Sequence, residues 1–150
     1  MFTGIDRDYN KILLCGMGAS GIGGRLFVDT MYYQSNITVQ IAKTMSLPKW
    51  ADDNTLVVVC SYSGNTYETI DLYEKAMAAG LDIVVVTHGG RLKDLAEENH
   101  NELLLIGGDP IQPRSAIGWF IGLIGGIIED AGGPGIRYQM RRILPWLRNS

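Results

Sequence analysis

The sequence predicts an α/β domain with a doubly wound, five-stranded parallel sheet in the flavodoxin-like order 2-1-3-4-5 and helices on both faces. Two observations predict this fold. Short runs rich in Val, Ile and Leu alternate with longer segments of helical character along the chain. The apolar runs are continuous, which is typical of parallel strands covered on both faces. A length of 150 residues is that of one domain, so we expect residues 1–150 to form a single unit.

The predicted elements follow one another along the chain as strands and helices. Strands are expected at the apolar runs near residues 11–15, 37–41, 55–60, 82–87 and 102–106. Helices are expected near residues 20–33, 65–79, 91–98 and 115–131, with a short amphipathic segment at 137–148. The first and third strands each run directly into a loop rich in glycine and hydroxyl side chains. The last long helix is apolar or glycine from Ala116 to Ile128 and ends at Glu129-Asp130.

Composition limits the classes of function. A net charge of −3, without a basic run, argues against nucleic acid as a partner. The apolar stretch Ala116–Ile128 is shorter than the ~17–25 residues of a membrane span, and the N-terminus lacks a secretory signal. Cys15 and Cys60 are expected to be buried thiols, with a bridge between neighbouring strands as the alternative. We therefore expect a soluble, cytoplasmic protein that has no membrane partner.

Two loops carry the functional argument. The first is Gly16-Met17-Gly18-Ala19-Ser20-Gly21, and the second is Ser61-Tyr62-Ser63-Gly64-Asn65-Thr66. Glycines let backbone N–H groups turn toward a ligand, a helix N-terminus adds partial positive charge, and the hydroxyls add donors. The order 2-1-3-4-5 places the two preceding strands on either side of the switch point where ligands bind. Together the loops predict one phosphate held from two sides.

Other interpretations of these loops remain open. Gly16-x-Gly18-x-x-Gly21 also fits a dinucleotide fingerprint, but the end of the second strand reads Gln40-Ile41-Ala42-Lys43, without the acidic residue such a site needs. The first loop could also be a strand–helix turn without a ligand. Any single hydroxyl of the second loop could serve only as a helix N-cap. Glu68 is expected to complement the helix dipole or close a capping box rather than act as a base.

With these loops the sequence resembles a sugar isomerase (SIS) domain, and more closely the N-terminal SIS domain of bifunctional phosphoglucose/phosphomannose isomerases. Two further segments carry the resemblance, Thr87-His88-Gly89-Gly90-Arg91-Leu92 and Gln112-Pro113-Arg114-Ser115-Ala116. The resemblance implies that glucose 6-phosphate or mannose 6-phosphate is interconverted with fructose 6-phosphate. It implies neither a metal nor an organic cofactor.

The resemblance also implies roles for individual residues. Four hydroxyls would hold the phosphate, and backbone groups of two residues of the first loop would line the cradle: Ser20, Ser61, Ser63, Thr66, Gly18 and Ala19. Arg114 would face the sugar as the catalytic cation, because a guanidinium can stabilise the negative charge of an enediol intermediate. The alternative for Arg114 is a surface position beside a helix that Ser115 caps. Ala19 stands where the family often has glycine.

The sequence does not show which residues would act as the acid and the base of the isomerase reaction. Isomerisation needs a base and a ring-opening group. His88, after the fourth strand, is expected to lie two strands from the cradle. Asp109, in the loop before Arg114, is the better carboxylate candidate. Two-domain members of the family carry a second SIS domain, so this chain is expected to pair with such a domain or to be a fragment that ends before it. Two other hypotheses are a non-catalytic phosphosugar sensor and a nucleotide-binding domain.

The helix at residues 115–131 predicts an interface. Gly118, Gly122 and Gly126 recur every four residues, and each costs about 1 kcal/mol relative to alanine within a helix. Close approach by another backbone would offset this cost, which favours a homodimer or pairing with a second SIS domain. The side chains expected to face the sheet are Ile117, Ile121, Ile124 and Ile128, and those at the interface edge are Trp119 and Leu123. The alternative is a helix pressed on its own sheet.

Overall fold

The structure, a computed structural model, describes residues 8–109 and 116–135. Its strands are β1 (Lys11–Gly16), β2 (Thr38–Ile41), β3 (Thr55–Ser61), β4 (Asp82–Thr87) and β5 (Glu102–Leu105). Its helices are α1 (Ala19–Gln34), α2 (Tyr67–Ala78), α3 (Gly90–Glu98) and α4 (Ile117–Asp130). These bounds lie close to those predicted from the apolar runs. The segment predicted at 137–148 lies outside the described residues.

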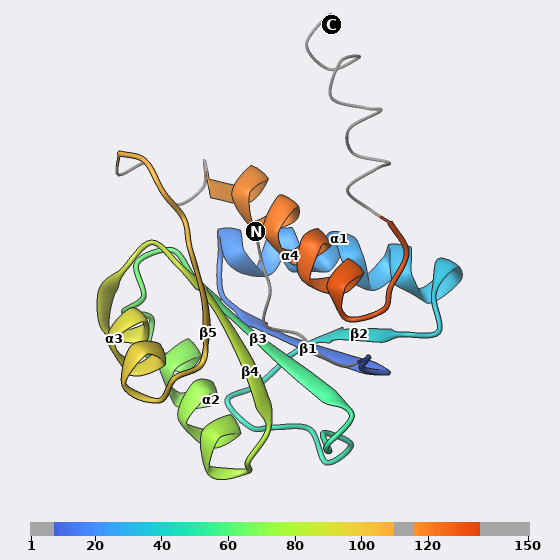
Figure 1. The fold of residues 1–150 in the computed structure, drawn as a ribbon, viewed down its shortest axis with the longest axis horizontal. Helices are drawn as coiled ribbons and strands as arrows, with labels where there is room; N and C mark the ends of the chain where they lie inside the picture. The colour runs from blue at the N-terminus through green and yellow to red at the C-terminus, as the bar shows by residue number, and fades with distance from the viewer. Residues whose placement is uncertain (1–7, 110–115, 136–150) are drawn as a thin grey trace, which may run out of the picture.

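The strands form one parallel sheet in the order β2-β1-β3-β4-β5, which confirms the predicted topology. Register places Gly16 beside Cys60 and Ser61 beside Thr87. The carboxyl ends of β1, β3 and β4 therefore share one edge of the sheet, at the upper left of Figure 1, where α1 begins.

Helices cover both faces of the sheet. Helices α1 and α4 pack on one face and α2 and α3 on the other (Figure 1). Every residue of β3 is buried, and its side chains alternate between the two apolar clusters, with Val58 in one and Val57 in the other. A central strand buried on both faces explains why its sequence is a continuous apolar run instead of an alternating one.

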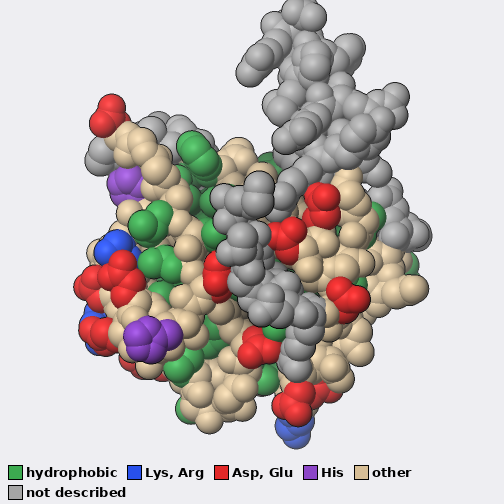
Figure 2. All heavy atoms as spheres, in the orientation of Figure 1, with side chains coloured by type: hydrophobic (Ala, Val, Ile, Leu, Met, Phe, Trp, Pro, Cys, Tyr) green, Lys and Arg blue, Asp and Glu red, His purple; other side chains and the backbone are tan. Residues whose placement is uncertain are grey.

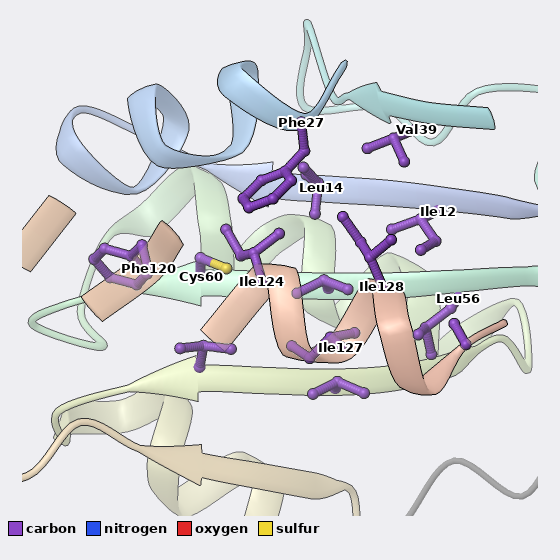
Figure 3. Packing of buried hydrophobic residues seen from close by; sticks show 14 of the residues in the cluster. Ile12, Leu14, Phe27, Val39, Leu56, Cys60, Phe120, Ile124, Ile127 and Ile128 are labelled. Carbon is purple, nitrogen blue, oxygen red and sulfur yellow. The ribbon is translucent and has the colours of Figure 1, made fainter. Parts of the chain in front are cut away.

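Helix α4 contacts the sheet through residues that differ in part from those predicted. Phe120, Ile124, Ile127 and Ile128 are buried and belong to the same apolar cluster on the sheet as Phe27 of α1, as Figure 3 shows. Ile124 and Ile128 were predicted correctly. Ile117 and Ile121 are only half-buried, because the apolar face of α4 is turned so that Phe120 fills the position beside α1.

The glycines of α4 do not form one continuous contact. A Cβ added to Gly118 or Gly122 would meet no atom of the described residues within 4 Å, whereas Gly126 is buried. The close approach lies instead on α1, where a Cβ added to Gly23 would stand 3.0 Å from the Cβ of Phe120. The predicted approach of a partner's backbone to this stripe stays a prediction; Trp119, next to Gly118 in the chain, is 49% exposed.

Figure 2 shows acidic side chains spread over the visible face and few basic ones among the described residues. None of the helices in residues 8–109 and 116–135 has the length and apolarity of a bilayer-spanning segment.

The two cysteines are free, buried thiols that pack in different apolar clusters on opposite faces of the sheet. A bridge between them is therefore excluded. Burial raises the pKa of Cys15 to about 12, and it raises the pKa of Cys60 further. A raised pKa means that the folded state holds the thiol proton more tightly than the unfolded state does. The resulting contribution to stability is complete below pH ~9 and is lost as pH rises through about 12.

We expect both thiols to resist a thiolate-directed reagent while the domain is folded, because only the thiolate reacts. At pH 8 the folded domain should show less than a tenth of the reaction rate of the urea-unfolded chain with 5,5′-dithiobis(2-nitrobenzoate). The rate should rise along the same transition that tryptophan fluorescence reports for unfolding. Fast reaction of either thiol in the folded domain would contradict the burial of these side chains.

Candidate functional site

The two glycine and hydroxyl loops meet at the carboxyl edge of the sheet. The first follows β1 and the second follows β3, and these strands are neighbours in the sheet. Gly18, the residue before α1, has a φ of 57° and a ψ of −128°, a combination that is open to glycine and strained for other residues. The predicted juxtaposition of the two loops at the switch point is thus present in the fold.

Ser20 lies in the first turn of α1 and is only 6% exposed. It packs over the end of β1, since a Cβ added to Gly16 would stand 3.1 Å from the Cβ of Ser20 and 3.1 Å from the carbonyl oxygen of Cys60. Glycine at position 16 therefore allows α1 to start close against the strand end. Ala19 begins α1 beside Ser20, and Gly18 precedes it.

The second loop is held by its own hydroxyl groups. Ser61 Oγ lies 3.0 Å from Thr66 Oγ1 and accepts a hydrogen bond of 3.1 Å from the backbone N–H of Gly64. Ser63 Oγ accepts a hydrogen bond of 3.2 Å from the N–H of Asn65. Ser61 is buried, Thr66 is half-buried and Ser63 is exposed, so the loop presents hydroxyls from its base to its tip.

Helix α2 starts directly from this loop. Thr66 is its N-cap residue, but the Thr66 side chain makes no capping hydrogen bond and pairs with Ser61 instead. The first N–H groups of a helix have no acceptor inside the helix, so they are available to a ligand at this end. Glu68 lies in the first turn of α2, where its carboxylate complements the dipole; it does not close a capping box with Thr66.

The loop after β4 braces the second loop. His88 donates its backbone N–H to the carbonyl of Tyr62 at 3.0 Å, and Leu92 donates to the carbonyl of Gly64 at 2.8 Å. Asn65 Oδ1 accepts from the N–H of Arg91 at 2.9 Å, which caps the start of α3. These contacts join residues far apart in the sequence. The sequence analysis did not predict them.

Gly64 makes the closest of these contacts. Its φ is +72°, and a Cβ at this position would lie 1.8 Å from the carbonyl oxygen of Gly89. No side chain fits between the two loops, so glycine is required here both by conformation and by space. The glycine of the serine-rich loop is therefore part of the architecture of the site.

A small hollow of about 110 Å³ lies beside the cradle, between the first loop and α2. Thr69 lines this hollow, and its Oγ1 is buried without a hydrogen-bond partner in the described residues. Glu68 and Lys43 also line it, and Lys43 occupies the region where a dinucleotide site would place an acidic residue.

The structure brings together Gly18, Ala19, Ser20, Ser61, Ser63 and Thr66 on neighbouring strand ends. Arg114, the predicted catalytic cation, lies outside the described residues. Asp109 is exposed at the end of the first described segment. His88 lies closer than predicted: β4 is the immediate neighbour of β3, and the imidazole stacks on Tyr62 of the serine-rich loop.

The chain is similar to known proteins in sequence and in fold, although no protein-family model matches it. It is 39% identical over 118 residues to a bifunctional phosphoglucose/phosphomannose isomerase of Caldicellulosiruptor bescii, a match that covers 78% of this chain and 34% of that protein. A D-glucosamine-6-phosphate 4-epimerase of Sulfolobus acidocaldarius is 37% identical over 95 residues, covering 63% of this chain and 29% of that protein.

Among solved structures, a phosphoheptose isomerase of Neisseria gonorrhoeae superimposes with a TM-score of 0.64 at 19% identity, over 82% of this chain and 76% of that chain. The sequence relatives and the shared fold decide the family. The chain is a sugar isomerase (SIS) domain. The SIS domain spans about a third of the length of the curated relatives that it matches. The resemblance read from the loop motifs is thereby confirmed.

Proposed function

We propose that this SIS domain binds a hexose 6-phosphate as part of an aldose–ketose isomerase that interconverts glucose 6-phosphate or mannose 6-phosphate with fructose 6-phosphate. The observation that carries the proposal is the hydroxyl cluster at the N-terminus of α2. There Ser61 Oγ and Thr66 Oγ1 lie 3.0 Å apart and Ser63 is exposed. Hydroxyl donors combined with a helix N-terminus match the geometry and charge of a phosphate monoester.

Each part of the cradle has its own role in this proposal. Ser63 and Thr66 donate hydroxyl hydrogens to phosphate oxygens, and the buried Ser61 fixes the loop through its bonds to Gly64 and Thr66. Ser20 and the backbone of Gly18 and Ala19 close the cradle from the first loop. No metal or organic cofactor is needed, because hydrogen-bond donors and the helix N-terminus stabilise the phosphate charge and enolisation of a sugar phosphate proceeds by proton transfer.

The relatives support the substrate class and the reaction separately. The two related proteins are named for phosphorylated hexoses, one as an isomerase and the other as a 4-epimerase. A phosphorylated hexose is therefore common to both, and the isomerase reaction rests on the more similar relative. In the proposed reaction Arg114 stabilises the enediolate oxygen, and a base from outside the described residues moves the proton between C1 and C2.

We further propose that residues 1–150 form one SIS domain that works in the cytoplasm and pairs with a second copy or with another SIS domain. Exposed apolar side chains on α1 and α4 support pairing, since Ile22 is 61% and Trp119 is 49% exposed. A Cβ added to Gly118, next to Trp119 in the chain, would meet no described atom within 4 Å. Large apolar side chains exposed together are typical of an interface.

Isotope exchange tests the reaction. Fructose 6-phosphate is incubated with the protein in heavy water and followed by proton and phosphorus NMR. The proposal predicts deuterium at C1 and the appearance of glucose 6-phosphate or mannose 6-phosphate. Phosphorus line broadening without exchange would show that the chain binds the phosphosugar without a working base, as expected of a phosphosugar sensor or of half an isomerase. The absence of both signals would contradict the substrate class.

A further inference from the structure

Two aromatic rings are stacked beside the serine-rich loop. The imidazole of His88 lies over the phenol ring of Tyr62, with centroids 5.1 Å apart and planes inclined by 10°. The backbone N–H of His88 donates to the carbonyl of Tyr62 at 3.0 Å, so the two residues are joined at backbone and ring alike. Tyr62 stands between Ser61 and Ser63 in the sequence. The pair is therefore built onto the phosphate-binding loop itself.

A hydrogen bond fixes the tautomer of His88. Its Nδ1 lies 2.8 Å from the carbonyl oxygen of Ile106, and the N–H of Ile106 is held in turn by the carbonyl of Thr87 at 2.9 Å. A carbonyl oxygen only accepts hydrogen bonds, so Nδ1 carries the hydrogen. In the neutral ring Nε2 then presents a lone pair, directed away from Ile106 and β5.

No hydrogen bond to Nε2 is formed within residues 8–109 and 116–135, and the His88 side chain is half-buried. An oriented acceptor without a protein partner, next to an aromatic face, is the kind of polar group that fixes a ligand in a pocket. A phosphate dianion has no hydrogen to donate, so this lone pair does not suit the phosphate. It suits a hydroxyl group.

We propose that the Tyr62–His88 pair is the sugar subsite of the SIS domain, and that Nε2 of His88 accepts a hydrogen bond from a hydroxyl of the bound hexose phosphate. The proposal rests on the proposed function, because the phosphate in the cradle of Ser61, Ser63 and Thr66 places the attached sugar beside the pair. His88 is thus a residue that selects the sugar, and the hydroxyl cluster is the part that holds the phosphate.

Side-chain NMR tests this assignment directly, because the chain has only 2 histidines, His88 and His100. The 15N shifts of both imidazoles are followed while fructose 6-phosphate, or inorganic phosphate as the comparison, is added. We expect Nε2 of His88 to shift with fructose 6-phosphate only, and the backbone amides of the serine-rich loop to shift with both. If the amides shift and His88 does not, the subsite is wrong and the proposed function stands. If neither shifts, both are wrong.

A matched pair of variants separates binding from folding. His88→Asn keeps an N–H that can reach Ile106 and removes the atom in the place of Nε2. We expect it to weaken fructose 6-phosphate binding several-fold to about tenfold, the usual effect of one lost hydrogen bond, with inorganic phosphate binding unchanged. His100→Asn is the control, since His100 is exposed with a φ of 57° that asparagine tolerates well. Equal affinities of His88→Asn and the wild type for fructose 6-phosphate would overturn the proposal.

Discussion

Gly64→Ala is expected to destabilise the domain by about 3 kcal/mol or more and to abolish hexose phosphate binding. The added Cβ would lie 1.8 Å from the carbonyl oxygen of Gly89, at a residue whose φ is +72°. The two atoms nearest to the added Cβ belong to the backbone of Gly89, so no flexible side chain can move aside to make room. The substitution must therefore separate the serine-rich loop from the loop after β4, which breaks the contacts that shape the cradle. Urea unfolding followed by fluorescence measures the free energy of unfolding.

Gly80→Ala is the matched control for this variant. Gly80 has a similar φ of +69°, but a Cβ there would meet nothing within 4 Å. Only the conformational cost remains, about 1 kcal/mol. The difference between the two variants isolates the contact between Gly64 and Gly89. Equal losses of stability in the two variants would show that this contact does not constrain the loop.

The double variant Ser63→Ala/Thr66→Ala is expected to weaken fructose 6-phosphate binding by about 100-fold or more. Two hydroxyl donors to a charged phosphate are lost, and each such hydrogen bond contributes about 1.5–3 kcal/mol. Ser63 is exposed and Thr66 half-buried, so stability should change by only ~1 kcal/mol. Titration calorimetry gives the affinity, and urea unfolding gives the stability of the same sample.

Thr38→Ala/Ser46→Ala serves as the control for that double variant. Thr38 and Ser46 are exposed hydroxyl residues outside the two loops of the cradle. The control removes the same groups from the surface and should leave the affinity within about twofold of the wild type. If Ser63→Ala/Thr66→Ala bound fructose 6-phosphate with the wild-type affinity, these hydroxyls would not be ligands of the phosphate.

The fold could be predicted because its signals are local and repeated. Continuous Val and Ile runs mark β3 and β4 as buried on both faces, and the order of the sheet places the loops after β1 and β3 together. The position of the serine-rich loop between β3 and α2 was also predicted correctly. Its hydroxyls lie within one short segment, so a phosphate site can be proposed there without knowledge of distant contacts.

The interactions that were not predicted all depend on residues distant in the sequence. Nothing local indicates that Gly64 lies against Gly89 or that the side chain of Asn65 caps α3. The prediction of which α4 residues face the interior was only half correct. Periodicity gives the spacing of apolar residues, whereas contact with α1 determines that Phe120 is buried and Ile117 is not. The adjacency of His88 to the cradle follows from the ring stack with Tyr62, which sequence spacing cannot show.

Calorimetric titration of the protein with fructose 6-phosphate, fructose and inorganic phosphate tests the phosphate cradle most directly. A cradle of hydroxyls at the start of α2 predicts binding of fructose 6-phosphate, weaker binding of inorganic phosphate and no measurable binding of fructose, because the phosphate supplies most of the interaction. Competition between inorganic phosphate and fructose 6-phosphate for one site is also expected. Equal binding of fructose and fructose 6-phosphate, or no competition by inorganic phosphate, would contradict the assignment of this site.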